Sequence, residues 1–555
     1  MKMDDALYKA YLVELESLEK FRMGYTALHP RAPLGREDQD VRRLTEALAL
    51  FSARTRLAGQ RALARNTLRL FRQHFPYVLN PVPAMAMLRA LPQDRCFVDP
   101  VELPRGTRVN FAPSRPGVGT GALAFRTLVP LRLNPSHLQR VDLIRREQGD
   151  RLVLSFESHF PRGRPPGPLL LYVNHLNEFR SSLAVHYQLK QTLREASVFF
   201  DEPASEHTRG LPCPRVRFGA PLPSLADLEP FEHPLQRLCS FFHFPQQELF
   251  VELSLPTPPP QWKKFTVCLD LKTRWPTELV LTQDTFVLHA TPMVNLQQTM
   301  ATPLEHDGTR ERHALQHPDP NGGFRVHSVL GVYRMDGQGL LPLRPAAISG
   351  GADTYEYEHE SQGTERRTWL SLDLPEAFTK PVRLAVDACW YQPIPPELDT
   401  SDYRVGLTDR FLEGLRWNTV GSVMPAQDNP LEHSQQGLLE LLSLRNQRFL
   451  RKEDLRFLLE ALGASAQRYF RPILEHLTEV AFTSKPFARS TTGFKYIYTL
   501  TFEGLDPLDV PTVDLLSARL RELLWTWSTE DVVELTVKLP DLDKTMTYSH
   551  REEER

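Results

Sequence analysis

Apolar positions in the first part of the chain recur at helical spacing. Within residues 4–28 they lie at steps of three or four, at Leu7, Tyr11, Leu15, Leu18, Phe21 and Tyr25. Within residues 38–58 they lie at steps of 3, 4 and 3, at Val41, Leu44, Leu48 and Phe51. Each set places a narrow apolar seam along one side of a helix. The pattern predicts a helix over 4–28, a second over 38–58 and a third piece over about 63–75.

The pattern changes after three prolines, Pro76, Pro81 and Pro83. Met85 and Met87 then alternate with small residues, as in a first β-strand, and short strands predominate from there. The abundance of proline, 47 residues against 28 glycines, supports a body of short strands. One helix is expected over about 177–195, after the strand LLLYVNH. The stretch GVGTG at 117–121 precedes a strand rather than a helix, so we interpret it as a hairpin turn and not as a phosphate loop.

The last section, about 431–540, has a pattern of its own. Helices are predicted at QQGLLELLSL and KEDLRFLLEALG, with Gly463 as the C-terminal stop of the second. Strict alternation in GFKYIYTLTF predicts a strand, and a helix and the strand DVVELTVKL follow. This order indicates a small α+β domain. The polar stretch 353–367 is expected to be a mobile loop, and the tail SHREEER to be disordered.

Together these patterns predict a multidomain α+β chain. It has an N-terminal helical bundle arm, β-rich central domains and a small C-terminal α+β domain. The expected divisions are 1–82 (helical arm), 83–230 (β-rich with one helix), 231–350 (second β-rich domain), 351–430 (strands and linker), 431–540 (α+β domain) and 541–555 (charged tail).

Composition narrows the class of protein. The 555 residues carry a net charge of −2, so bulk binding to nucleic acid is not expected. The five cysteines are scattered and none is at C-x-x-C spacing, which indicates free thiols in a reducing compartment. The acidic N-terminus lacks the basic region and apolar run of a signal peptide, and no apolar stretch approaches a membrane span. We therefore expect a cytoplasmic protein with no integral membrane span.

No catalytic motif stands out in the sequence. The best candidates for metal ligands are His306, Asp307, His313 and His317, but they lie in a segment rich in turn residues. A solvated loop is the favoured interpretation there, and a solvated face is favoured for Glu356 and Glu358. We expect no catalytic, cofactor-binding or metal-binding residue, no cofactor and no enzymatic activity.

A basic stretch is the most distinctive charge feature. No Asp or Glu occurs between Ala47 and Gln93, and Arg61, Arg65, Arg69 and Arg72 share one helical face. This face either is simply solvated or meets an acidic partner helix. Nucleic acid is less favoured, because no aromatic residues are interleaved with the arginines for stacking on bases. A membrane surface is less favoured still.

A family resemblance rests on a long N-terminal motif, D-V-x-R-L-x-E-A-x-A-x-x-x-A-R, followed by P-x-x-L-x-P-x-P-x-M-A. The matching residues are Asp40, Val41, Arg43, Leu44, Glu46, Ala47, Ala49, Ala53 and Arg54, then Pro76, Leu79, Pro81, Pro83, Met85 and Ala86. A middle motif adds Thr291, Pro292, Val294, Asn295, Leu296, Pro303 and Tyr333. With the aromatic segment after Phe231 and the C-terminal end, these stretches cover about 1–540. They resemble the TssF family, baseplate subunits of the bacterial type VI secretion system.

The resemblance implies a structural role. The chain would form a baseplate wedge with a second copy of itself, a TssG-like subunit and TssK-like and TssE-like subunits, beside neighbouring wedges around a hub. It would support sheath assembly and triggering, and would be cytoplasmic but docked at the inner membrane through the assembled baseplate. A β-rich hydrolase or a carbohydrate-binding protein is the alternative class.

The helical seams predict the partner-binding residues. They contain more apolar surface than a two-helix hairpin can hide, and burying each such side chain is worth roughly 1.5–3 kcal/mol. We predict an intersubunit bundle through Leu7, Tyr11, Leu15, Leu18, Val41, Leu44, Leu48, Phe51, Arg61, Arg65 and Arg69.

Overall fold

The computed structural model groups the chain into two compact units. One comprises Met1–Pro76 with Leu431–Ser443, and the other comprises Tyr77–Pro430 with Leu444–Arg555. The structure describes residues 5–31, 34–35, 38–75, 78–93, 97, 99–115, 121–162, 166–205, 208–220, 234–337, 339–346, 351–362, 365–395, 398–429, 431, 434–445, 447, 449–465, 468–486, 494–528 and 532–549. It confirms the predicted class, a multidomain α+β chain. The finer division of the body that the sequence suggests stays a prediction.

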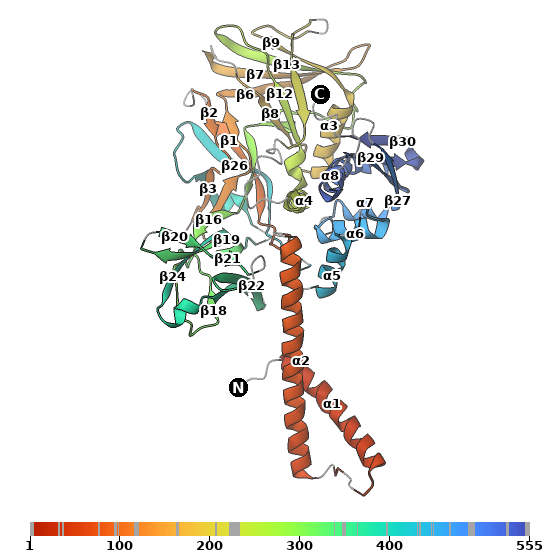
Figure 1. Ribbon diagram of the computed structural model, residues 1–555. Coiled ribbons are helices and arrows are strands. Elements are labelled where there is room, and N and C mark those ends of the chain that lie inside the picture. Colours follow the sequence, from red (N-terminus) through yellow and green to blue (C-terminus); the bar gives the residue numbers. More distant parts are fainter. Residues whose placement is uncertain are drawn as a thin grey trace. The chain divides into compact units, whose positions relative to one another are not determined.

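The first unit is helical. Its elements are α1 (Asp5–Leu28), α2 (Gln39–His74) and nearly all of α5 (Gln435–Leu444). Helix α1 lies beside the N-terminal half of α2, and the two form an antiparallel hairpin (Figure 1). The side chain of Asp38 caps α2 by accepting a hydrogen bond from the backbone N–H of Asp40 at 3.0 Å. The first predicted helix is confirmed almost to the residue.

Helix α2 corrects one expectation. The sequence suggested two pieces, 38–58 and 63–75, but α2 is continuous from Gln39 to His74 and contains Gly59. A glycine in a helix costs only about 1 kcal/mol relative to alanine. The flanking residues Ala58, Arg61 and Ala62 are strong helix formers, so the helix continues through the glycine.

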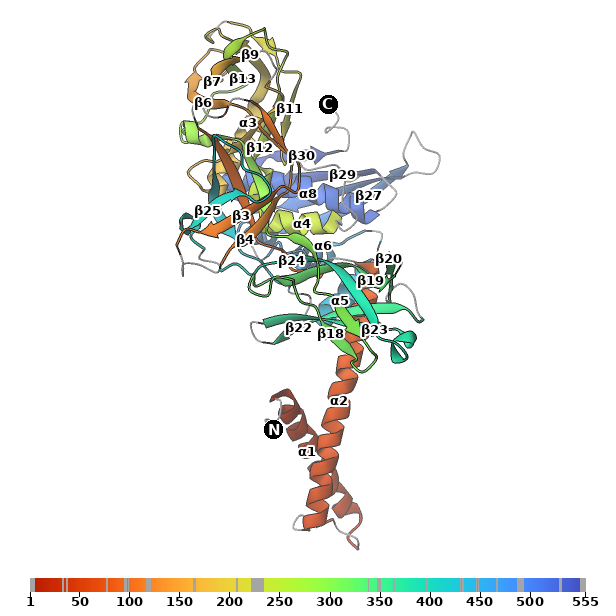
Figure 2. The same ribbon diagram turned by 90° about the vertical axis from the view of Figure 1, so that its left-hand side faces the viewer.

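The second unit is built around a closed barrel. Its described strands, in order around the barrel, are β1 (Met85–Pro92), β15 (Ala290–Val294), β4 (Leu123–Thr127), β3 (Arg108–Pro113), β25 (Tyr403–Leu407) and β26 (Leu415–Met424). Figure 2 shows β3, β4 and β25 side by side. Strands β3 and β4 pair antiparallel, as the hairpin interpretation of GVGTG requires, although residues 116–120 lie outside the described part. A small sheet of β2 (Val101–Leu103) and β5 (Leu131–Leu133) accompanies the barrel.

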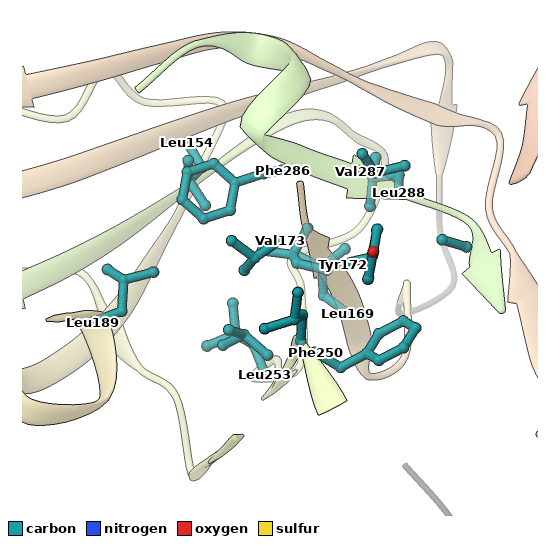
Figure 3. Close-up of a cluster of buried hydrophobic side chains, with 14 of the residues drawn as sticks. Leu154, Leu169, Tyr172, Val173, Leu189, Phe250, Leu253, Phe286, Val287 and Leu288 are labelled. Atoms are coloured by element: carbon teal, nitrogen blue, oxygen red, sulfur yellow. The ribbon is translucent and has the colours of Figure 1, made fainter. Parts of the chain in front are cut away.

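Two further sheets enclose an extensive apolar core of described residues. One contains β10 (Leu211–Pro212), β9 (Leu193–Phe200), β13 (Trp262–Leu271), β7 (Arg151–Arg162) and β6 (Ser136–Ile144). The other contains β11 (Arg215–Phe218), β12 (Phe250–Ser254), β8 (Leu169–Val173) and β14 (Phe286–Leu288). The helical elements of this part are α3 (Phe179–Thr192), α4 (Pro234–His243), η2 (Pro245–Glu248) and η3 (Gln283–Thr285). Figure 3 shows side chains from β7, β8, α3, β12 and β14 meeting in one cluster, which includes Leu154, Val173, Leu189 and Phe250.

A second pair of sheets contains most of the stretch 353–367, which the sequence predicted to be a loop. One contains β16 (Gln297–Met300), β24 (Val382–Tyr391), β19 (Arg325–Asp336) and β20 (Gly339–Pro342), with β17 (Leu304–His306) beside β24. The other contains β18 (Arg312–Ala314), β23 (Glu365–Asp373), β22 (Thr354–Gln362) and β21 (Arg344–Pro345). The turns η4 (Pro375–Phe378) and η5 (Thr400–Asp402) follow.

The polar stretch 353–367 is therefore not a loop, because most of it forms the antiparallel hairpin of β22 and β23. Tyr355 and Tyr357 alternate with the acidic residues Glu356 and Glu358, and Tyr355 is buried. This alternation of aromatic and charged residues suits a strand with one face packed on a core.

The C-terminal section follows its predicted order. Helices α6 (Lys452–Ala461) and α7 (Arg471–Glu475) precede a sheet ordered β27 (Leu477–Pro486), β28 (Phe494–Phe502), β29 (Val532–Leu539) and β30 (Lys544–Tyr548). The turn η7 (Pro507–Asp509) leads into α8 (Val510–Ser528), and η8 (Pro540–Leu542) into β30. Gly463 adopts φ +99°, as a helix stop requires. Strand β30 lies within the segment assigned to the tail, and the section belongs to the same compact unit as the barrel.

Candidate partner-binding surface

The seam predicted on α1 lies against α2. Leu7, Tyr11, Leu15 and Leu18 are all half-buried, and α1 is in contact with α2. Glu14 lies on the same side of α1, and its carboxylate accepts a hydrogen bond from the Arg56 guanidinium of α2 at 3.0 Å. This face therefore holds the hairpin together.

Small side chains form the matching face of α2. Ala49 and Ala53 are both fully buried, with 0% of their surface exposed. They are four residues apart and so share one face of the helix. Alanine lets two helix axes approach closely, since no long side chain stands between them. The hairpin thus packs on residues that the search for large apolar side chains did not select.

The seam predicted on α2 is mostly exposed. Leu44, Leu48 and Phe51 are 64%, 55% and 65% exposed, and Val41 is half-buried. A helix turns by about 100° per residue, so Phe51 and Ala53 point to opposite sides of α2. We call Leu44, Leu48 and Phe51 the outer strip. It is a row of large apolar side chains on the side of α2 away from α1.

Other exposed apolar side chains on the hairpin were not among the predicted site residues. They are Tyr8, Leu12, Val13, Phe21, Met23 and Leu28 on α1, and Leu63 and Leu70 on α2. Phe21 lies at the spacing of the predicted seam on α1, whereas the others lie off the predicted seams and so were not found by spacing. Their number matters, because isolated exposed apolar residues are normal but a concentration of them marks an interaction site.

The predicted basic face lies on the second half of α2. Positions 61, 65 and 69 are four residues apart on a continuous helix and so share one face. Arg69 is exposed, whereas the side chains of Arg61 and Arg65 lie outside the described part. The choice between a solvated face and an acidic partner remains a prediction.

The histidine candidates do not form one cluster. His306 lies on β17 and His313 on β18, and a hydrogen bond of 2.9 Å joins Nδ1 of His306 to Nε2 of His313. Both rings are buried, not solvated as expected, and burial lowers the pKa of each imidazole. His317 instead stacks on Phe324, with ring centroids 3.9 Å apart. Among the described residues, no group of three or more His, Cys, Asp or Glu side chains is placed to hold a metal ion.

None of the described cysteines forms a disulfide bond. Cys213 is half-buried, and Cys239, Cys268 and Cys389 are buried. Burial raises the pKa of the Cys239 thiol to about 12, which disfavours the reactive thiolate. Cys96 lies outside the described residues. In the described part of the chain, no helix combines the length and hydropathy that a membrane crossing needs.

Comparison with known protein structures identifies the fold. A chain in the cryo-electron microscopy structure of the type VI secretion system TssK-TssF-TssG baseplate subcomplex is 18% identical, with a TM-score of 0.76; the match covers 92% of this chain and 99% of that one. A chain in the baseplate complex from the type VI secretion system is 17% identical, with a TM-score of 0.58 and 98% of each chain covered. None of the curated proteins matches.

Comparison with family models identifies the family. The model described as "Type VI secretion system, TssF" matches residues 3–370, about two thirds of the chain. The match includes the helical hairpin, the first barrel strands and the middle motif around Thr291 and Asn295. The resemblance inferred from the sequence motifs is thereby confirmed, and the chain belongs to the TssF family of the type VI secretion system.

Proposed function

We propose that this chain is a structural subunit of a type VI secretion baseplate and that it catalyses no reaction. Its family supports this role. The similar solved chains belong to a TssK-TssF-TssG subcomplex and to a baseplate complex, so we propose TssG-like and TssK-like subunits as partners. We therefore favour the structural role over a hydrolase or a carbohydrate-binding protein. The same role implies a cytoplasmic location.

The observation that carries the proposal is the outer strip. Leu44, Leu48 and Phe51 stand in water on the side of α2 that α1 leaves uncovered. Burying a large apolar side chain completely is worth about 1.5–3 kcal/mol. Since these side chains are 55–65% exposed, a partner helix that covers all three gains roughly 3–6 kcal/mol before the costs of association. That gain suits a bundle with helices of another subunit.

The proposed role assigns a partner subunit to each part of the chain. We propose that α1 and α2 enter an intersubunit bundle with a second copy of this chain and with the TssG-like partner. Arg61, Arg65 and Arg69 then meet an acidic helix of that partner. TssE-like subunits and neighbouring wedges contact the body, and the assembled baseplate docks at the inner membrane. Rearranged interfaces between subunits, not a chemical step, release the extended sheath.

Co-purification tests the proposal. The chain is co-expressed with the tagged TssG-like product of a neighbouring gene, and the yield of complex is measured. Leu44→Asp combined with Leu48→Asp should reduce the yield to background, because two carboxylates would be buried in an apolar interface. The β-rich unit should keep its unfolding transition, since the substitutions lie in the helical unit.

The matched control makes the same chemical change elsewhere. Val280 and Leu508 are 65% and 81% exposed in the β-rich unit, so Val280→Asp with Leu508→Asp also replaces two exposed apolar side chains by acids. This variant should co-purify at the parental yield. The proposal is wrong if the outer-strip variant also co-purifies at full yield.

A further inference from the structure

The barrel is closed between β25 and β26 by very little strand pairing. Strand β26 pairs with β1 along its length, from Met85↔Met424 to Pro92↔Leu415. Strand β25 pairs with β3 over its whole length. Between β25 and β26, however, the described residues form a single bridge, Val405↔Trp417. Most of each strand therefore has no strand partner on that side, and such an edge can accept another chain.

A cleft lies along this seam. Its volume is about 790 Å³, and its walls are residues 403–412 and 415–417 with Gln93. Ligand-binding clefts have volumes of about 300–1,000 Å³. Because this one is bounded by two strands and the loop that joins them, its shape suits an extended chain that adds to a strand edge. We call it the β25–β26 cleft.

The charge of the cleft indicates which kind of peptide segment it can bind. Its lining contains Arg404, Arg410 and Arg416 but a single carboxylate, that of Asp409. Arg410 donates to the backbone carbonyl of Glu102 at 3.5 Å. The side chains of Arg404 and Arg416 are exposed, and neither guanidinium group has a hydrogen bond or ion pair with the rest of the described chain. Guanidinium groups bind carboxylates through paired, charge-assisted hydrogen bonds, so the cleft favours an acidic segment.

An exposed aromatic side chain lies at the same place. Phe411, in the loop between the two strands, is 89% exposed. Leu412, Leu415 and Trp417 beside it in the lining are half-buried. Aromatic residues that become covered by a partner contribute most of the energy of many interfaces, and arginine is the other residue enriched at such positions. The cleft therefore combines both kinds of anchor.

We propose that the β25–β26 cleft binds an extended acidic segment of a partner protein. The backbone of the segment pairs with the open strand edges. Its carboxylates reach Arg404 and Arg416, and an apolar side chain covers Phe411. This second docking surface lies in the β-rich unit and goes beyond the role proposed for the outer strip. Its test therefore does not depend on the helical hairpin.

Labelled peptides test the proposal on the full-length chain. The probe is a fluorescent decapeptide of alternating Glu and Val, and binding is followed by fluorescence anisotropy. One comparison peptide replaces Glu by Lys, and a second replaces Val by Pro, which keeps the charge but removes the alternate backbone N–H groups. The Glu-Val peptide should bind at least about tenfold more tightly than either, and its affinity should fall with added salt.

Variants of the cleft locate the binding site. Arg404→Glu with Arg416→Glu should weaken binding of the Glu-Val peptide by about tenfold or more, and Phe411→Ser should weaken it several-fold. Because all three side chains are exposed, these changes should leave the unfolding transition unchanged. The matched control is Arg344→Glu with Arg383→Glu, two exposed arginines on other strands, which should bind the peptide as the parent does.

The outcomes are distinguishable. A photo-crosslinking group in the Glu-Val peptide should attach to residues 403–417, and attachment elsewhere overturns the proposal. The proposal is also overturned if the Pro-containing peptide binds equally well, or if inorganic tripolyphosphate at equal charge competes fully. Either result shows that the cleft binds anions and not a strand. An absence of binding by the Glu-Val peptide, or unchanged binding by both cleft variants, overturns the proposal as well.

Discussion

Replacing Ala53 by leucine should separate the two helices of the hairpin. Ala53 is fully buried on the face of α2 that α1 covers, and Ala49 one turn away is equally buried. A leucine adds three carbon atoms where the helices touch. Leucine forms helices almost as well as alanine, so any loss of stability reflects packing between α1 and α2 and not the helix itself.

The size of the effect follows from close packing. Extra carbon atoms in a well-packed contact typically cost about 1–3 kcal/mol, because neighbouring side chains must shift. A cost of 2 kcal/mol raises the population in which α1 is detached by about 30-fold. The backbone amides of α1 should then exchange with deuterium about 30-fold faster, since they exchange through that detached state.

Hydrogen exchange measured by mass spectrometry on the full-length chain reports this opening peptide by peptide. Peptides from α1 should show the change, and peptides from the barrel should not. Ser52→Leu is the matched control, because Ser52 is exposed and next to Ala53 and its replacement adds a similar volume. If Ala53→Leu leaves the exchange of α1 unchanged, α1 does not pack on this face of α2. The outer strip is then not the side of α2 that α1 leaves uncovered.

Three further predictions concern the β-rich unit, and urea unfolding of the full-length chain measures each. Burial lowers the pKa of His186 to about 4 and of His327 to about 3, so the unfolded chain binds protons near pH 6.5 while the folded chain does not. Stability should be highest above pH 6.5 and fall as the pH drops towards 4, by up to about 1.4 kcal/mol per pH unit for each histidine, and His186→Gln should flatten the slope. Arg519→Met should cost about 3 kcal/mol, because it leaves the buried carboxylate of Glu248 without its guanidinium partner, and adding Glu248→Gln should restore part of the loss. Gly463→Ala should cost about 1–2 kcal/mol, because φ is +99° there, and an unchanged urea midpoint would contradict this account of the helix stop.

Local patterns predicted the elements that depend on near neighbours. Strict alternation predicted the strand at GFKYIYTLTF, which is β28, and the helix expected after it is α8, with Pro511 in its first turn. The strand pairings of the barrel could not be found in this way. Strand β1 pairs with β15 and with β26, roughly two hundred and more than three hundred residues further on, and no local spacing encodes such contacts.

Two expectations failed because polarity was given too much weight. The hairpin of β22 and β23 was interpreted as a loop, although Tyr355 and Tyr357 supply one apolar face beneath the charged side chains. Likewise, the turn residues near His313 concealed two short strands that bury its ring against His306. In both cases a strand needs only every second residue to be buried, so a segment rich in charge can still be part of a sheet.

The α2 helix makes a more general point about apolar seams. Spacing predicts that Leu44, Leu48 and Phe51 bind a partner helix, and the residues buried within the hairpin itself are Ala49 and Ala53. In a folded monomer large apolar side chains are usually the ones that are buried, because they have most to gain from leaving water. The reverse arrangement, with alanines inside and leucines and phenylalanine outside, costs free energy in the isolated chain. Such a helix is expected where another subunit completes the fold. The spacing of the outer strip and its exposure in the hairpin together therefore indicate a partner, which neither observation does alone.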